Sequence, residues 1–498
     1  MSHSESTSGS RPYTVHRFRA VARPVGLLVA GLAVMMLVCA PAGLIMGSPE
    51  GASHMGTSAI LTASLAALLL LIGRRAEPGE IGRREALLVV TSSWVLASLV
   101  GAVPFVIGAE LSWFEAIFES TSGFTTTGAT ILPEISERLS HSLHLWRVLS
   151  HWLGGMGIVV LFVAVFPALG VGGRHLFHTE AAGPRSKGLS PRIKERSAML
   201  WRAYLVLTLI ELCLLMVSGL NPFDSLIHAL STMGTGGFSN LNGSVGQMHN
   251  PAAEWIILVF MLIGGMNFGL IQPAIRSGPR TLLRHTETKA YFLIFGLIAL
   301  LVALTTWQSD IGVHDTVRNA SFQVAAIMTT TGLSTYDYEL WPAFAQLMIF
   351  ILYFIGGSSG STAGGVKVIR ILILFRAAKA ELARSFRPHV VHTIRVGREA
   401  VSPETLREVI AFCALFGVTV LGGAIAVALL DPVEPQTALI ASLACVANVG
   451  PGFDLVGPTD NYGFFSGGSQ LVLSTCMLLG RLELVTVLAL LVPSFWKR

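Results

Sequence analysis

Apolar runs alternate with short polar segments along nearly the whole chain of 498 residues. A helix that crosses a bilayer needs about 20 mainly apolar residues. Runs of this kind occur at 26–46, 57–73, 87–107, 146–171, 199–220, 255–275, 290–307, 343–375, 409–430 and 471–493. Shorter apolar segments at 113–122, 223–233, 316–329 and 435–447 are predicted to enter the bilayer and turn back. The pattern predicts an all-α polytopic membrane protein with about ten spans and four half-length helices.

The half-length helices recur at similar places in four successive repeats, and this repetition organises the sequence. Each is followed by a glycine-centred segment: Thr126-Thr127-Gly128-Ala129, Gly234-Thr235-Gly236-Gly237, Thr330-Thr331-Gly332-Leu333 and Asn448-Val449-Gly450-Pro451. Four copies of one loop can build a ring of backbone carbonyls, and such a ring can replace the water shell of a monovalent cation. Glycine lets the backbone turn these oxygens inward, and the C-terminal ends of helices favour a cation. We therefore predict ion permeation.

Composition and charge agree with a membrane setting. Hydrophobic residues make up 52% of the chain and charged residues 13%, whereas soluble proteins carry roughly twice that charged fraction. Arginine and lysine concentrate after alternate spans, at 74–84, 174–196, 276–289 and 370–398, and the other connecting segments are acidic. The basic segments and both termini are therefore predicted to be cytoplasmic, with the four glycine segments on the outer side. An acidic outer mouth concentrates cations.

Two features interrupt the later apolar runs. The segment Gly356-Gly357-Ser358-Ser359-Gly360-Ser361-Thr362-Ala363-Gly364-Gly365 lies midway along the eighth run. Because each interior glycine costs a helix about 1 kcal/mol relative to alanine, this segment is predicted to be a break and not merely a kink. Arg481 lies near the middle of the last run, where a charged side chain costs at least about 2.5 kcal/mol. It is predicted to face a pore or, alternatively, to pair with Glu211 or Glu483.

A different class of function also has a motif in the chain. Gly357-Ser358-Ser359-Gly360 fits the Gly-x-Ser-Gly pattern of an intramembrane serine protease, for which His151 or His228 would be the base. Such a protease does not require four half-length helices with four glycine loops, so we favour a transporter over an enzyme. The five cysteines lack metal-ligand spacing, and we find no phosphate-binding fingerprint at the end of a strand. Neither a zinc site nor a nucleotide site is predicted.

The chain resembles the Trk/Ktr/HKT superfamily of potassium transporters and, within it, the TrkH-type membrane subunit. The resemblance runs from residue 26 to 498 and is most specific at 120–128, 151–158, 228–238, 356–370 and 448–453. It implies four helix–pore-loop–helix repeats in a pseudo-tetrameric, potassium-channel-like arrangement, plus two additional N-terminal transmembrane helices. The boundaries that we expect are a cytoplasmic tail at 1–25, a two-helix leading domain at 26–85, and pore repeats at 86–195, 196–285, 286–400 and 401–498.

The resemblance also implies roles for single residues. In this family the filter glycines match Gly128, Gly236, Gly332 and Gly450, and glycine in all four repeats indicates potassium selectivity. The expected ion-binding filter residues are Thr126, Thr127, Gly128, Gly234, Thr235, Gly236, Thr330, Thr331, Gly332, Asn448, Val449 and Gly450. The expected gate is an intramembrane loop at 356–365, comprising Gly356, Gly357, Ser358, Ser359, Gly360, Ser361, Thr362, Gly364 and Gly365, with Arg481 projecting into the path beneath the filter.

The function implied by the resemblance is potassium uptake across the bacterial cytoplasmic (inner) membrane. The chain would need no cofactor of its own, apart from the potassium ion in the filter. Expected partners are a TrkA-like cytoplasmic nucleotide-binding regulatory subunit, a second copy in a homodimer, and membrane lipid, but no nucleic acid. The alternative within the same superfamily is a sodium-permeable or proton-coupled cation transporter.

Overall fold

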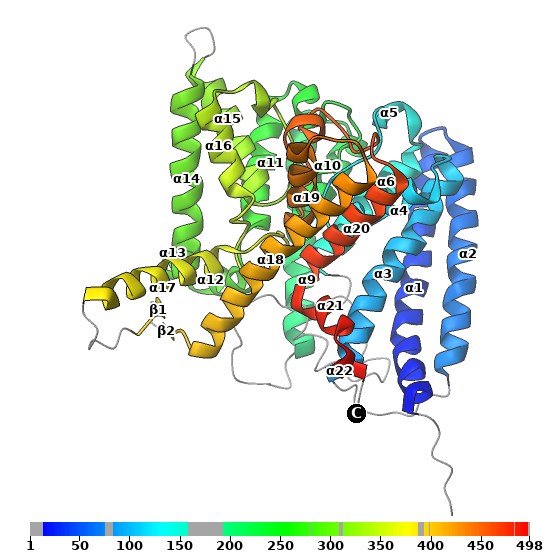
Figure 1. Ribbon diagram of the computed structural model, residues 1–498. Coiled ribbons are helices and arrows are strands. Elements are labelled where there is room, and N and C mark those ends of the chain that lie inside the picture. Colours follow the sequence, from blue (N-terminus) through cyan, green and yellow to red (C-terminus); the bar gives the residue numbers. More distant parts are fainter. Residues whose placement is uncertain are drawn as a thin grey trace, which may run out of the picture.

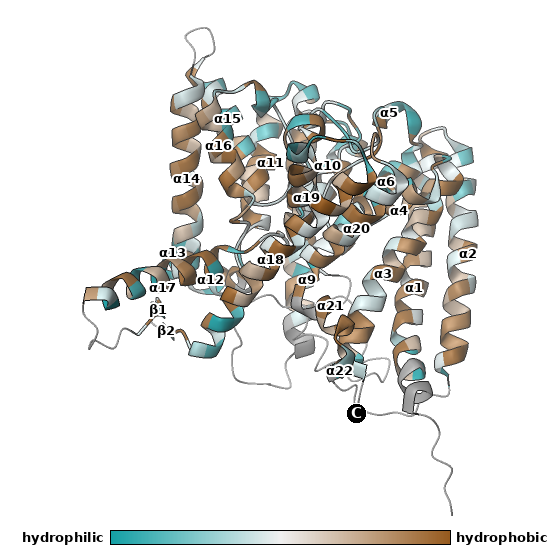
Figure 2. Ribbon diagram, viewed as in Figure 1, coloured by the Kyte–Doolittle hydropathy of each residue, from teal (hydrophilic) through white to brown (hydrophobic). Residues whose placement is uncertain are grey.

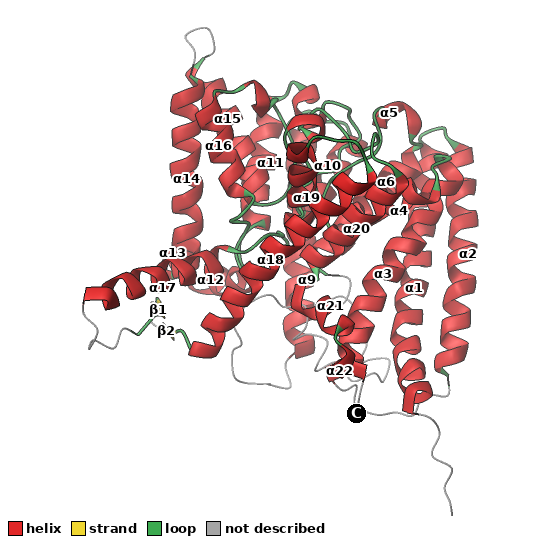
Figure 3. Cartoon of the chain, in the orientation of Figure 1, coloured by secondary structure: helices red, strands yellow, loops and turns green. Residues whose placement is uncertain are grey.

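The computed structural model describes residues 13–74, 83–157, 193–278, 280–307, 312–386, 393–397, 399–482 and 484–496. These parts are helical apart from turns, loops and one antiparallel pair of very short strands, β1 (Arg395–Val396) and β2 (Glu399–Ala400). The helices form one bundle, and loops run into its interior (Figure 3). Apolar residues dominate the middle of the bundle, and hydrophilic residues gather toward its two ends (Figure 2). The all-α membrane fold predicted from the sequence is confirmed.

Two leading helices, α1 (Tyr13–Ile45) and α2 (Pro49–Gly73), pack side by side at one edge of the bundle (Figure 1). The face of α1 that carries Val25, Leu28, Leu32 and Met36 is buried, as expected for residues at helical spacing on one side. Because α1 begins at Tyr13, it includes part of the segment predicted as the N-terminal tail, and the boundary at residue 25 stays a prediction. Residues 13–25 form the first turns of this helix.

Four half-length helices lie between longer ones: α4 (Trp113–Phe124), α10 (Pro222–Gly234), α15 (Val313–Met328) and α19 (Pro435–Ala447). Their starts follow from local sequence. Ser112 and Glu115 form a capping box ahead of α4, and the Asn221 side chain caps α10, whose first residue is Pro222. The four half-length helices predicted from the sequence are confirmed to within a few residues.

Each half-length helix packs between the helix before it and the helix after it. The preceding helices are α3 (Arg83–Gly108), α9 (Ile193–Val217), α14 (Thr286–Thr306) and α18 (Pro403–Leu430). The following helices are α6 (His141–Gly155), α11 (Pro251–Gly264), α16 (Ala343–Leu352) and α20 (Gly467–Arg481). Four consecutive stretches of the chain therefore share one order of elements.

Shorter elements complete the described chain. They are α5 (Ile135–Arg138), η2 (Ser244–Met248), η3 (Phe268–Leu270), α12 (Ile271–Ser277), α13 (Arg280–Arg284), η4 (Tyr338–Leu340), α17 (Val368–Phe386), η5 (Asp454–Val456), α21 (Leu484–Leu491) and α22 (Pro493–Trp496). The start of α1, the basic helices α12, α13 and α17, and the C-terminal α22 lie at the same end of the bundle (Figure 1). This arrangement agrees with the prediction that both termini of the chain lie on one side of the membrane. That this side faces the cytoplasm stays a prediction.

The ten predicted spans appear in two forms among the described residues, as continuous helices and as interrupted ones. Within the described residues, six helices are long and apolar enough to cross a bilayer. Three of the remaining predicted spans are interrupted, between α11 and α12, between α16 and α17, and between α20 and α21. At the first break, the carbonyls of Gly264 and Gly265 accept hydrogen bonds from the segment at 356–365. Beyond residue 157, the predicted span at 146–171 lies outside the described residues.

Candidate functional site

The backbone takes the same unusual course after each half-length helix. Thr126, Thr235, Thr330 and Asn448 all have positive φ, between 51° and 55°, a conformation that is uncommon for residues other than glycine. Two positions later stands a glycine with φ of 72° to 93°: Gly128, Gly237, Gly332 and Gly450. These features define four equivalent loop segments, at 126–128, 235–237, 330–332 and 448–450.

Each loop segment lies directly against the next one. A Cβ atom on Gly128 would collide with the carbonyl oxygen of Gly236, and one on Gly237 would collide with that of Thr331. In the same way, Gly332 faces the carbonyl of Val449, and Gly450 faces the carbonyl of Thr127. The fourth segment thus returns to the first, and the contacts close a ring. Glycine is required here both for its positive φ and for its lack of a side chain.

A single cavity touches all four loop segments. Its lining includes Gly128, Gly237, Gly332 and Gly450, together with residues that follow each segment. The cavity therefore lies on the side of the ring away from the half-length helices. Asp460 also lines it, and burial and the nearby Asp337 and Asp454 raise the pKa of that carboxyl group. The structure thus places one acidic group of the predicted acidic side at the cavity.

The register predicted for the second segment is wrong by one residue. Gly237, and not Gly236, has the positive φ and the neighbour contact that Gly128, Gly332 and Gly450 have. Gly234 is the last residue of α10. Three glycines in the stretch 234–237 leave the register open in the sequence, and Phe238 in this segment takes the place of Ala129 in the first. Gly236 instead lies against the imidazole ring of His151, which a Cβ atom would strike.

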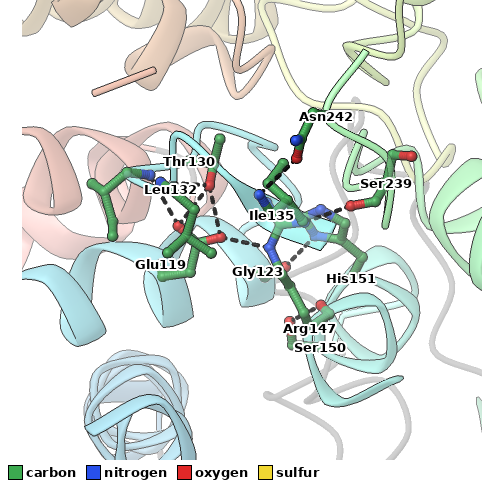
Figure 4. A network of polar contacts seen from close by, with 11 residues as sticks. Glu119, Gly123, Thr130, Leu132, Ile135, Arg147, Ser150, His151, Ser239 and Asn242 are labelled. Atoms are coloured by element: carbon green, nitrogen blue, oxygen red, sulfur yellow. Dashed lines mark hydrogen bonds and ion pairs between the residues drawn. The ribbon is translucent and has the colours of Figure 1, made fainter. Parts of the chain in front are cut away.

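A buried network of hydrogen bonds holds the backbone that follows the first two segments (Figure 4). The Arg147 Nε atom donates to the Glu119 carboxylate at 2.6 Å, and the exposed fractions of the two side chains are 1% and 0%. Glu119 also accepts from the backbone N–H of Ile131, which follows the first segment. Arg147 donates to the carbonyl of Ser239, which follows the second segment, at 2.8 Å. One ion pair therefore ties both segments to α4 and α6.

His151 completes this support. Its Nδ1 atom lies 2.7 Å from the carbonyl oxygen of Gly123, and its ring stacks on Phe238 with 4.0 Å between centroids. The Arg147 guanidinium covers the Phe238 ring, with its carbon 3.5 Å from the ring centroid. The sequence did not reveal this group as support for the ring, because its members are far apart along the chain.

The glycine-rich segment at 356–365 breaks the helix between α16 and α17, as predicted. Its backbone pairs with the break after α11: Ser358 N–H donates to the Gly265 carbonyl at 2.9 Å, and the Thr362 hydroxyl donates to that of Gly264 at 3.0 Å. Gly364 N–H donates to the Thr330 hydroxyl in the third loop segment at 2.7 Å. The glycine-rich segment therefore lies against the ring and is held by backbone carbonyls of the second repeat and by a side-chain hydroxyl of the third loop segment.

Three charged side chains hold the glycine-rich segment. Arg481 donates to the carbonyl of Thr362 at 2.7 Å and to those of Gly154 and Gly155 at 2.7 and 3.0 Å. Lys367 donates through Nζ to the carbonyl of Ala363. These contacts join α20, α6 and the glycine-rich segment.

The third charged group is Glu287 in the first turn of α14, which is 1% exposed. It accepts from the Ser359 N–H at 2.7 Å and from the Ser359 hydroxyl at 2.8 Å. Pairing of Arg481 with Glu211 does not occur, because neither Glu211 carboxylate oxygen has a hydrogen-bond partner among the described residues. Glu483, the other alternative partner, lies outside the described residues.

The histidines proposed for the protease alternative have other partners. Ser359 donates its hydroxyl to Glu287, whereas His151 contacts Gly123 and Phe238. His228 lies with Nδ1 against the Asp224 carbonyl and Nε2 against the Ser239 hydroxyl. The hydrogen bonds of these side chains do not assemble a serine–histidine pair, so the geometry does not favour a protease.

The sequence of this chain is similar to those of known membrane transport proteins. The family model described as TrkH, a cation transport protein, matches residues 54–498. The chain belongs to the TrkH family. The Trk system potassium uptake protein TrkH of Salmonella typhimurium is 36% identical over 96% of this chain and 99% of its own length. The TrkI protein of Halomonas elongata, also named for potassium uptake, is 34% identical over 97% and 98%.

A solved TrkH structure has the same architecture. The crystal structure of the potassium transporter TrkH from Vibrio parahaemolyticus matches with a TM-score of 0.86 and 33% identity, and the match covers 96% of this chain and all of that one. The likeness therefore extends over nearly the whole chain. This TrkH-family chain is a multi-pass membrane protein of the cation-transporter class.

Proposed function

We propose that this chain takes up potassium as the pore-forming subunit of a Trk system, and that the ring of four loop segments is its selectivity filter. The observation that carries the proposal is the closure of the ring, in which the glycine of each segment faces the carbonyl of the next. A ring of carbonyls can coordinate a dehydrated monovalent cation. The half-length helices end at the segments, so their negative dipole ends favour a cation there.

Potassium is favoured over the sodium-permeable or proton-coupled alternative by glycine in all four segments. A serine at Gly128 would bring its Cβ into the carbonyl of Gly236 and push the first two segments apart. The relatives named above are potassium uptake proteins. The filter proposal uses the corrected set of residues, with Gly237 in place of Gly236 as the second filter glycine.

The experiment is uptake of potassium, rubidium and sodium into proteoliposomes that hold the purified full-length protein, beside a Gly128→Ser variant. We expect wild-type uptake to favour potassium and rubidium, and the variant to lose that preference because its ring is distorted. Equal uptake of sodium and potassium by the wild type would contradict the proposal.

The glycine-rich segment at 356–365 is proposed as the gate. It lies against the third loop segment and depends on side chains from other helices for its position. Movement of α20, α6 or α14 would therefore be transmitted to it.

Replacement of Arg481 by alanine is expected to raise potassium uptake by the purified protein about tenfold or more. The variant removes hydrogen bonds from a charged group, each worth about 1.5–3 kcal/mol, together with a positive charge from the path. Rubidium uptake into proteoliposomes measures the effect. Arg276→Ala, which removes an exposed arginine of α12, is the control and should leave uptake unchanged. Wild-type uptake in Arg481→Ala would exclude Arg481 from gating.

Glu287→Gln is also expected to raise potassium uptake, by up to about tenfold. The neutral amide has only one acceptor oxygen, so it cannot accept both hydrogen bonds that Ser359 donates to the carboxylate. Glu381→Gln changes a carboxylate that is 71% exposed and serves as its control. An unaltered rate in Glu287→Gln, with normal thermal stability, would show that the Ser359 contact does not hold the gate closed.

A TrkA-like nucleotide-binding subunit is the proposed regulatory partner, and a second copy of the chain is the proposed dimer partner. The basic helices α12, α13 and α17 share one end of the bundle with the C-terminal α22 (Figure 1), and this end is proposed to face the cytoplasm of a bacterial inner membrane. An acidic docking face on the regulatory subunit would fit these helices.

A further inference from the structure

The four loop segments are not held in the same way. In the first segment, the hydroxyl oxygens of Thr125 and Thr127 lie 2.8 Å apart, and Thr125 also donates to the Thr121 carbonyl in α4. The third segment repeats this arrangement: Thr329 and Thr331 are 2.7 Å apart, and Thr329 donates to Ala325. Paired threonines therefore fasten these two segments to their own half-length helices.

The second and fourth segments lack both threonines. Gly234 and Gly236 occupy the equivalent positions in the second segment, and Ala447 and Val449 occupy them in the fourth. None of these side chains can donate a hydrogen bond. The second segment is supported instead by His151 and Arg147 from α6, as described above. The fourth must be supported by other groups.

The Asn448 side chain donates to the Thr127 hydroxyl at 3.0 Å and to the Met477 carbonyl at 2.9 Å. Three tyrosine hydroxyls hold the carbonyls that follow. Tyr462 donates to the carbonyl of Gly450 at 2.7 Å, and Tyr353 donates to that of Pro451 at 2.6 Å. Tyr338 donates to the carbonyl of Gly452 at 2.5 Å. Three consecutive peptide groups, beginning at the glycine of the fourth segment, are thus each held by one phenol.

The three tyrosines are themselves fixed in place. Tyr338 is 0% exposed, Tyr353 1% and Tyr462 2%. Tyr353 and Tyr338 come from the stretch that carries the third segment, whereas Tyr462 precedes α20 and its backbone N–H donates to the Thr130 carbonyl, just beyond the first segment. The fourth segment is therefore held from both of its neighbours in the ring.

We propose that Tyr462, Tyr353 and Tyr338 are positioning residues that determine cation selectivity, because they replace the missing threonine pair and fix the carbonyls of the fourth segment. This inference rests on the proposed filter function. The peptide plane that Tyr462 holds adjoins the Val449–Gly450 peptide, whose carbonyl faces Gly332 of the neighbouring segment. Without the phenol, that carbonyl gains freedom to follow a smaller ion, and discrimination against sodium falls.

The test is cation binding to the purified full-length protein in detergent, which does not require an open gate. Potassium chloride and sodium chloride are titrated at constant ionic strength, and the shift of the thermal unfolding midpoint gives an apparent dissociation constant for each ion. The variants are Tyr462→Phe and Tyr353→Phe, which keep the ring and remove only the hydroxyl. The matched control is Tyr291→Phe, since Tyr291 is equally buried but donates to the helix carbonyl of Leu262 at 3.1 Å.

We expect wild-type protein to bind potassium more tightly than sodium. In Tyr462→Phe the ratio of the two dissociation constants should fall about fivefold, the equivalent of one buried hydrogen bond, with Tyr353→Phe giving the same direction. Tyr291→Phe should lower the midpoint without salt and leave the ratio unchanged.

The outcomes separate the two proposals. A wild-type preference for potassium that persists in both tested tyrosine variants would overturn the positioning role alone. If Tyr462→Phe fails to fold, the Tyr353→Phe ratio decides the question. A wild type without any preference for potassium would contradict the proposed filter itself, and the inference about the tyrosines would fall with it.

Discussion

Replacing Gly237 by alanine is expected to reduce potassium uptake more than tenfold. The added methyl group would strike the carbonyl of Thr331, and the backbone at this position has a φ of 86°. A left-handed conformation alone costs a residue with a Cβ about 1–2 kcal/mol, and the collision with backbone adds to that cost. Uptake of potassium and sodium into proteoliposomes measures the loss, and the remaining flux should be less selective.

The matched control is Gly219→Ala, in the loop between α9 and α10. Gly219 has a φ of 100°, but no atom lies within 4 Å of the position of its Cβ. This variant incurs the conformational cost without a collision, so its uptake and selectivity should be close to those of the wild type. Similar losses in both variants would mean that the contact between the second and third segments is not what matters.

Arg147→Met is expected to lower the free energy of unfolding by about 3–5 kcal/mol, because it leaves the buried carboxylate of Glu119 without its ion-pair partner. It also removes the support of the Ser239 carbonyl behind the second segment. The midpoint of thermal unfolding in detergent measures the effect. The double variant Glu119→Gln with Arg147→Met should recover part of the loss, since no buried charge then remains uncompensated.

Arg384→Met is the control for the loss of unfolding free energy in Arg147→Met, because it removes an ion pair at the surface. Arg384 pairs with Glu381 on α17, but the two side chains are 57% and 71% exposed. Exposed ion pairs contribute at most about 1 kcal/mol, so this variant should barely shift the midpoint. If Arg147→Met and Arg384→Met have equal midpoints, the buried pair is not a main support of the ring.

Much of the fold follows from the sequence because apolar length and local capping decide it. The half-length helices α4 and α10 begin close to where predicted, since the capping box at Ser112 and the residues Asn221 and Pro222 mark their starts. The helix break after Gly264 was not predicted, because the Gly264 carbonyl there accepts a hydrogen bond from Thr362, 98 residues further along the chain. Apolar composition cannot reveal such partners.

The candidate site was predictable in part. Gly128, Gly332 and Gly450, which the sequence singles out, each face a carbonyl of the next segment. The choice between Gly236 and Gly237 depends on which of them faces Thr331, and that contact is long-range. Arg481 was noticed because a charge at that depth needs a partner, although its partners are backbone carbonyls and not Glu211. The contact of Tyr462 with the fourth segment could not be predicted from the sequence, because a single tyrosine in a loop is compatible with many structural roles.

The four loop segments are proposed to form one ring that coordinates a dehydrated cation. Crystals grown in rubidium chloride would show the ion, because rubidium substitutes for potassium and its anomalous scattering locates it. We predict a strong peak within the ring, bounded by the carbonyls of Thr127, Gly236, Thr331 and Val449. An empty ring, with rubidium bound elsewhere in the protein, such as beside Glu211, would contradict the account.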